Sequence, residues 1–176
     1  MLKSLVSALL FFLSFTAHAL EKGQKAPLFK TKNQDGVAFD LKEREGKGWT
    51  VLYFYPKAET PGCTKQACAF RDSIKVIEKQ NAKVFGVSTD SVEKLAKFKA
   101  HHKLTFDLLS DEKGEICESY GTKWPILKIS KRHTFILDPT LVIRYIDQNV
   151  DPVYDAKKVA DELLKLQSAP QETKKN

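Results

Sequence analysis

The chain has 176 residues and carries 29 lysines and arginines against 22 aspartates and glutamates, which gives a formal net charge of +7 at pH 7. The lysines are interspersed with acidic residues, and this pattern indicates a solvated surface rather than a nucleic-acid site. Three cysteines, an odd number, exclude a framework built only of disulfides, because at least one thiol is left over.

The first nineteen residues have the layout of a cleavable secretory signal. Lys3 precedes an apolar run over residues 5–15, and Ala17-His18-Ala19 supplies small residues at the cleavage site. This run is shorter than the roughly 20 residues that a membrane-spanning helix needs. We expect cleavage after Ala19, export to the periplasm or the medium, and no stable membrane association; an uncleaved anchor is the alternative.

A single domain is expected over residues 20–167, and it opens with a β-hairpin. Residues 28–31 and 37–41 alternate between apolar and polar side chains and flank an Asp-Gly turn. Residues 51–55 are a continuous apolar run that ends at Pro56. Such a run predicts a central strand covered on both faces.

A helix is predicted to begin at Pro61, because proline is favoured at the first helical position and Thr60 can serve as the N-cap. Apolar side chains then recur at three- and four-residue spacing and form a buried stripe, whereas the charged residues between them face water. This stripe comprises Ala67, Phe70, Ile74 and Ile77. Arg71 lies on the charged face, where we expect a surface ion pair.

Two further strands and a helix follow. Residues 84–88 and 106–109 have the composition of strands. Between them, Asp90 and Glu93 have the spacing of a capping box, which predicts a helix extending to about His102.

The last third of the chain contains the remaining elements. A short helix ends at Gly121, a favourable C-terminal cap. Residues 134–137 and 141–146 predict a pair of strands, and residues 155–166 predict an amphipathic helix. The polar residues 168–176 are expected to be a disordered tail.

This order of elements predicts an α/β fold in which helices flank a central mixed β-sheet. Strands alternate with helices after the opening hairpin, and a strand pair and a helix close the domain. A thioredoxin-like fold has this order.

Cys63 lies in the first turn of the predicted helix, directly after the carboxyl end of a buried strand. Reactive groups lie at this position in open α/β sheets. Unpaired backbone N–H groups and the positive end of the helix dipole favour a thiolate there. A thiolate is a strong nucleophile, so Cys63 is a candidate reactive residue.

Cys68 follows five positions later. On an ideal helix its Cα lies about 8.7 Å from that of Cys63 and about 140° around the axis. A disulfide needs Cα atoms closer than about 7 Å, so the helix must unwind before the two sulfurs can join. This favours a transient disulfide; the alternative is that Cys68 is a small core residue and Cys63 a chance surface thiol.

Residues 54–72 closely resemble the active-site signature of peroxiredoxins. Within this family they resemble the bacterioferritin comigratory protein or Q subgroup, in which the resolving cysteine lies five residues after the peroxidatic one. The resemblance continues through residues 84–88, 111–114, 120–121 and 132–138.

This resemblance implies a thioredoxin-like, thiol-dependent peroxidase that reduces hydrogen peroxide and organic hydroperoxides. It assigns Cys63 as the peroxidatic and Cys68 as the resolving cysteine. It further implies that Thr60 hydrogen-bonds the peroxide, Pro56 shields the thiolate, and Arg132 stabilises the thiolate and the charge on the peroxide oxygens. A Cys63 sulfenic acid would then form a disulfide with Cys68, which a thioredoxin-like protein reduces. We expect a monomer without metal or cofactor.

Some features depart from the family pattern. Glu59 stands where aspartate is usual, which keeps the charge, and residues 123–130 differ from the usual segment ahead of Arg132, which leaves the pocket rim and substrate preference open. The secretory signal requires a thioredoxin-like donor outside the cytoplasm. Cys117 lies outside the signature and is expected to be a buried core thiol.

Two other functions are compatible with a thioredoxin-like fold. The first is a copper-binding metallochaperone with Cys63, Cys68 and His133 as ligands, because thiolates suit Cu(I). That class spaces its cysteines four apart rather than five, and this chain carries Thr60 and Arg132 instead. The second is a non-catalytic binding module. A thioredoxin-type disulfide oxidoreductase is disfavoured because Cys-x-x-Cys is missing.

Overall fold

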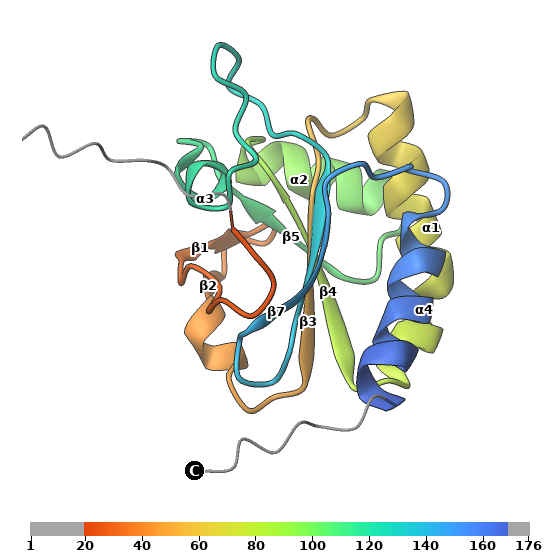
Figure 1. The fold of residues 1–176 in the computed structure, drawn as a ribbon. Helices are drawn as coiled ribbons and strands as arrows, with labels where there is room; N and C mark the ends of the chain where they lie inside the picture. Colours follow the sequence, from red (N-terminus) through yellow and green to blue (C-terminus); the bar gives the residue numbers. More distant parts are fainter. Residues whose placement is uncertain (1–19, 169–176) are drawn as a thin grey trace, which may run out of the picture.

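The computed structural model describes residues 20–168, and a seven-stranded mixed sheet runs through its middle (Figure 1). The strands are β1 (Lys30–Asn33), β2 (Ala38–Asp40), β3 (Trp49–Phe54), β4 (Ala82–Ser88), β5 (Asp107–Ser110), β6 (His133–Leu137) and β7 (Ile143–Asp147). Their order in space is β2-β1-β5-β4-β3-β6-β7. β4 is parallel to β3 and to β5, and the other pairs are antiparallel. The predicted α/β fold with a mixed sheet is confirmed.

Helices cover both faces of this sheet (Figure 1). They are the 3-10 helix η1 (Leu41–Arg44) and the α-helices α1 (Pro61–Glu78), α2 (Val92–His101), α3 (Glu115–Ser119) and α4 (Asp155–Ser168). Along β3 the side chains of Val51 and Tyr53 pack with α1, α2 and α4, whereas Leu52 and Phe54 pack on the opposite face with η1 and α3. All four are fully buried, as predicted for a central strand.

The capping box predicted for α2 is wrong. Ser91 is the N-cap, and its side chain accepts a hydrogen bond from the backbone N–H of Lys94. The carboxylate of Asp90 is buried and accepts instead from the backbone N–H of Ala58, at 2.7 Å, and from the hydroxyl of Ser88. A tertiary contact therefore engages the side chain of Asp90, which local spacing predicted to cap the helix.

Several predicted boundaries shift by one or two residues; for example, β3 and β4 each begin two residues earlier than predicted. The hairpin is confirmed with its turn glycine, Gly36, at φ 73°, but β1 lies two residues later than predicted. β7 begins at Ile143 because Leu141 has φ 61° and belongs to the turn after β6. α4 extends beyond Leu166 to Ser168, which was predicted to belong to the tail.

The predicted signal, residues 1–19, and residues 169–176 of the predicted tail lie outside the described residues. Within residues 20–168, no helix combines the length and apolarity needed to cross a membrane.

Candidate active site

The sheet register brings Cys63 and Arg132 together. β6 runs antiparallel to β3, and Phe54 at the end of β3 pairs with His133 at the start of β6. Cys63 lies in the first turn of α1, just beyond β3, and Arg132 immediately precedes β6. Although they are 69 positions apart, Arg132 Nη2 donates to Cys63 Sγ at 3.3 Å.

Cys63 is almost completely buried, with 1% of its surface exposed. It packs in the same core cluster as Tyr53, Tyr55 and Ala58. Burial raises the pKa of both tyrosines well above the usual range, so the two phenols stay neutral. The guanidinium of Arg132 is the positive group that contacts the sulfur in this apolar setting.

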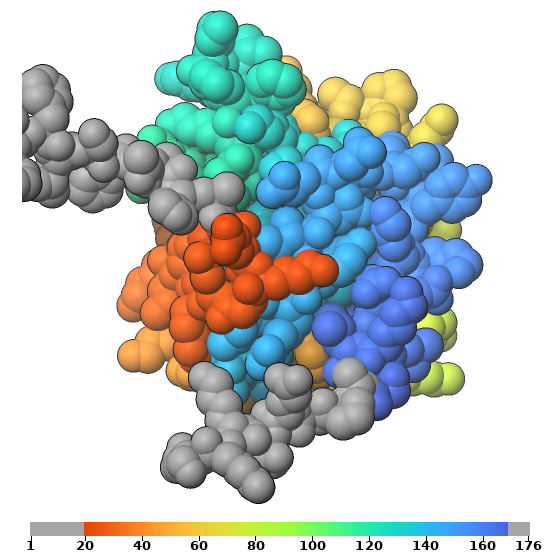
Figure 2. Space-filling view, in the orientation of Figure 1, coloured from red at the N-terminus to blue at the C-terminus, as the bar shows by residue number. Residues whose placement is uncertain are grey.

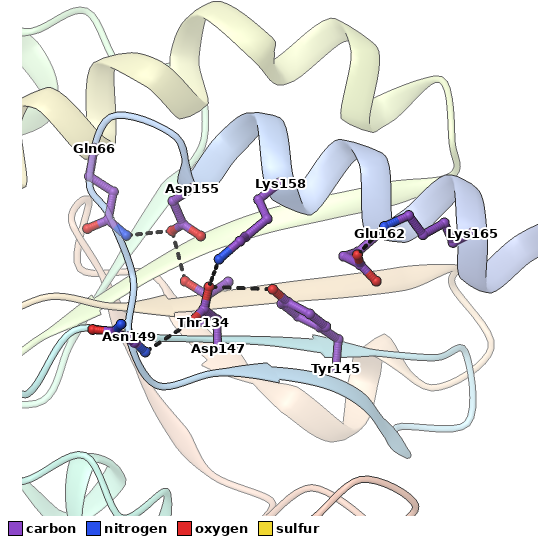
Figure 3. A network of polar contacts seen from close by, with 9 residues as sticks. All are labelled: Gln66, Thr134, Tyr145, Asp147, Asn149, Asp155, Lys158, Glu162 and Lys165. Carbon is purple, nitrogen blue, oxygen red and sulfur yellow. Dashed lines mark hydrogen bonds and ion pairs between the residues drawn. The ribbon is translucent and has the colours of Figure 1, made fainter.

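A chain of hydrogen bonds holds Arg132 from behind, and Figure 3 shows the part of it that joins Gln66, Asp155 and Thr134. Arg132 Nη1 donates to the side-chain oxygen of Gln66, and Gln66 Nε2 donates to Asp155 Oδ2 at 2.6 Å. The hydroxyl of Thr134 donates to the same oxygen at 2.8 Å. The charge of Asp155 thus orients the amide of Gln66, whose oxygen in turn orients the guanidinium toward Cys63.

Asp155 has an unusual environment for a carboxylate. It is 2% exposed, and burial raises its pKa to about 6, against the opposing effect of the hydrogen bonds from Gln66 and Thr134. Within the described part of the chain, its second oxygen has no hydrogen-bond partner. The group is therefore mostly ionised at neutral pH but loses its charge in mild acid.

The loop between β3 and α1 is fixed by backbone contacts. Asp90 holds the N–H of Ala58, and the backbone oxygen of Thr60 accepts from the N–H of Thr64, which starts α1. Thr60 occupies the predicted N-cap position, but its hydroxyl donates to the Lys57 carbonyl at 2.9 Å and makes no cap bond. The hydroxyl oxygen keeps its acceptor capacity. Pro56 is half-buried at the start of this loop.

Cys68 lies on the same uninterrupted helix as Cys63. Cys68 is half-buried, and the thiols of Cys63 and Cys68 are not joined in a disulfide. The helical geometry confirms the spacing argument: the two sulfurs cannot form a disulfide while the first turns of α1 stay wound.

Cys117 and Arg71 both behave as predicted. Cys117 is fully buried, and burial together with the carboxylate of Asp111 raises its pKa to about 12. Arg71 pairs with Asp72 at 2.8 Å on the surface. It also donates to the backbone oxygen of His102, which ties α1 to the end of α2.

Copper binding through Cys63, Cys68 and His133 is not supported. His133 is buried, and burial lowers its pKa. Among residues 20–168, the one group of three side chains spaced to hold a metal ion consists of Glu59, His101 and His102. The three proposed copper ligands do not form such a group.

The segment that departs from the family pattern projects from the body of the molecule. Residues 123–130, teal at the top of Figure 2, form a loop in which Lys123 pairs with Ser130. Ile126 at its tip is 94% exposed, and Trp124 and Leu127 are also exposed.

Three residues of the site escaped sequence reasoning. Gln66 carries a recognisable signal, because it lies on the buried face of α1, where a polar side chain needs a partner. Asp155 and Asp90 carry no local signal, since both were assigned to the starts of helices. Their partners lie 89 and 32 positions away in the chain.

Comparison with known proteins places these features in context. Residues 22–146 match the AhpC/TSA family. Peroxiredoxin Q of Oryza sativa subsp. japonica, a chloroplastic protein, is 40% identical over 148 residues, which make up 84% of this chain and 66% of that protein, just under two thirds of its length.

Two solved structures are similar over most of the chain. Peroxidoxin BcpB from Mycobacterium tuberculosis is 34% identical with a TM-score of 0.80, covering 86% of this chain and 100% of that one. The bacterioferritin comigratory protein of Xanthomonas campestris, which has alkyl peroxide reduction activity, is 28% identical with a TM-score of 0.73, covering 78% and 91%. These matches confirm the thioredoxin-like architecture.

Proposed function

The chain belongs to the AhpC/TSA family, and on that premise we propose that it is a thiol-dependent peroxidase that reduces hydrogen peroxide and organic hydroperoxides. The predicted resemblance to peroxiredoxins of the Q or bacterioferritin comigratory type is confirmed by the relatives. The observation that carries the proposal is the 3.3 Å contact between Cys63 Sγ and Arg132 Nη2 at the start of α1.

The first step is attack of the Cys63 thiolate on one peroxide oxygen. A sulfur–oxygen bond forms, the O–O bond breaks, and the sulfur is oxidised to a sulfenic acid while the peroxide is reduced to an alcohol or water. Arg132 stabilises the charge that develops on the departing oxygen, which then takes up a proton. Thr60 can hydrogen-bond the peroxide and align the O–O bond, and Pro56 limits the access of water to the sulfur.

The second step consumes the sulfenic acid. The first turns of α1 unwind, the Cys68 thiol attacks the Cys63 sulfur, and a disulfide forms as water leaves. A thioredoxin-like dithiol protein then reduces this disulfide and becomes oxidised itself. We propose that the chain works as a monomer, because both sulfurs come from the same helix.

Peroxide turnover with a dithiol reductant tests the proposal. Cys63→Ser is expected to abolish peroxide consumption, and Cys68→Ser is expected to retain the first step and accumulate a sulfenic acid that a dimedone-type reagent labels. Retention of activity in Cys63→Ser would overturn the assignment.

We also propose that the protein is exported, although the relative from rice is chloroplastic. The support is the continuous apolar run with the single cation Lys3 in residues 1–19, whereas organelle transit peptides are amphipathic and rich in arginine. The mass of the mature protein from the native cell tests this: a chain that begins at Leu20 supports export, and one that retains residue 1 contradicts cleavage.

A further inference from the structure

A second cluster of reactive side chains lies beside the loop that leads into α1. Glu59 comes from this loop, and His101 and His102 come from the end of α2. Glu59 Oε1 lies 3.2 Å from His101 Nδ1, and Glu59 Oε2 lies 3.0 Å from His102 Nε2. The two imidazole ring centres are 4.4 Å apart.

The backbone fixes this arrangement from both sides. Glu59 has φ 64°, a left-handed conformation that is costly for a residue with a side chain, and its carboxylate meets the histidines from there. His102 forms the C-cap of α2, and its backbone oxygen accepts the hydrogen bond from Arg71 of α1. The backbone of His102 is therefore held by a contact that does not depend on the side chains of the cluster.

We propose that Glu59, His101 and His102 bind a divalent transition-metal ion, with Zn²⁺ as the best match. Two imidazoles and one carboxylate are a donor set typical of zinc sites that keep one position for water. Donor atoms around a tetrahedral Zn²⁺ lie roughly 3.3 Å apart, because the bonds are about 2 Å long. The donor atoms here all lie within 4.8 Å of one another, and His101, whose side chain is 70% exposed, is free to rotate inward.

The position of this site gives the ion a consequence for catalysis. Glu59 directly precedes Thr60 and the first turn of α1, which must unwind before Cys68 reaches Cys63. An ion that joins Glu59 to the end of α2 restrains the start of the segment that moves. On the proposed function, bound Zn²⁺ therefore slows formation of the Cys63–Cys68 disulfide while Cys63 still reacts with peroxide.

Zinc binding is tested first, without reference to catalysis. Calorimetric titration with Zn²⁺ uses the Cys63→Ser/Cys68→Ser variant, so that the active-site thiols cannot bind the ion, and the buried Cys117 does not compete. We expect one ion per chain, and an affinity at least about tenfold weaker when Glu59→Gln or His101→Ala is added. Glu78→Gln, an exposed change on α1, is the matched control and should bind as tightly as its parent. No binding, or equal affinity in all four proteins, would overturn the site.

The kinetic consequence is tested in a single turnover of the reduced protein with one equivalent of peroxide. Zn²⁺ is expected to slow the loss of the Cys68 thiol several-fold in the unmodified chain and to have no effect in His101→Ala. Equal slowing in both proteins would mean that the ion acts at the cysteines, and it would overturn the regulatory role. Failure of the zinc-free protein to form a disulfide would refute the proposed function instead, and it would leave the calorimetric result intact.

Discussion

The amide of Gln66 lies between two groups of opposite charge. Its oxygen accepts from Arg132, and its nitrogen donates to Asp155. Gln66→Met keeps the length and helix propensity of the side chain but removes both contacts, so the guanidinium is no longer oriented toward Cys63. We expect the rate of Cys63 oxidation by peroxide to fall about tenfold.

Stopped-flow measurement of this oxidation checks the prediction. Lys65→Met introduces the same side chain at the neighbouring exposed position and should oxidise as fast as the unmodified protein. Equal rates for the two variants would show that the Gln66 contacts do not position Arg132.

The buried carboxyl of Asp155 makes stability depend on pH. Its pKa rises from 3.8 to about 6 on folding, so between these values the folded protein holds a proton that the unfolded chain has released. The free energy of unfolding therefore falls as pH rises through this window and is constant above it. Asp155→Asn removes this dependence while keeping an oxygen that can accept from Gln66 and Thr134.

Urea unfolding of the two proteins checks this sign. The stability of Asp155→Asn relative to the unmodified protein should improve by about 2 to 3 kcal/mol between pH 4 and pH 7. A difference that is independent of pH, or one that changes in the opposite direction, would contradict a raised pKa.

At the scale of elements, the proposed function requires α1 to be stable enough to position Cys63 and weak enough to unwind toward Cys68. Lys65 lies between the two cysteines with its side chain exposed, so substitutions there change helix stability alone. Glycine is less favourable than alanine in a helix by about 1 kcal/mol, which corresponds to about fivefold in an unwinding equilibrium. Lys65→Gly is therefore expected to form the disulfide about fivefold faster than Lys65→Ala.

A single-turnover assay that follows peroxide consumption and thiol loss separately tests this prediction. The first rate should be the same in both variants. The pair Lys75→Gly and Lys75→Ala, beyond Cys68 on the same helix, should show no difference in either rate. Equal disulfide rates for the two Lys65 variants would indicate that α1 unwinding does not limit resolution.

The elements themselves could largely be predicted from local patterns. The stripe of α1 follows from the spacing of its apolar residues, and the burial of β3 on both faces follows from its continuous apolar run; both are confirmed. The start of α2 could not be predicted, because Asp90 bonds to Ala58 in a distant loop rather than to its own helix. Local capping rules cannot anticipate such competition from tertiary contacts.

At the scale of the whole molecule, the site depends on pairings that single residues do not reveal. Arg132 could be assigned only through resemblance to a family. Its local sequence does not show that β6 pairs with β3, and this pairing is what brings Arg132 to Cys63. Gln66 and Asp155 meet because α1 and α4 pack side by side on one face of the sheet (Figure 1). Sequence reasoning thus pointed to Cys63 and Cys68 as the candidate reacting residues but not to the residues that support the guanidinium.

Hydrogen exchange tests how far oxidation spreads through the molecule. Because both cysteines belong to α1, the disulfide form should exchange amide protons faster across residues 58–68, while β3 and β4 keep their protection. Mass spectrometry of the reduced and oxidised proteins measures this difference. Unchanged protection of α1 would contradict unwinding, and loss of protection in the central strands would show that the change is not local.

The location of both sulfurs on one helix also affects how the protein is recycled. On the proposed function, we expect oxidised and reduced molecules to differ in the shape of one surface segment, residues 58–68. We expect an electron donor that recognises only the unwound segment to bind oxidised molecules and not reduced ones. Such discrimination would keep the donor from being occupied by reduced molecules. The donor would also not compete with peroxide for access to Cys63.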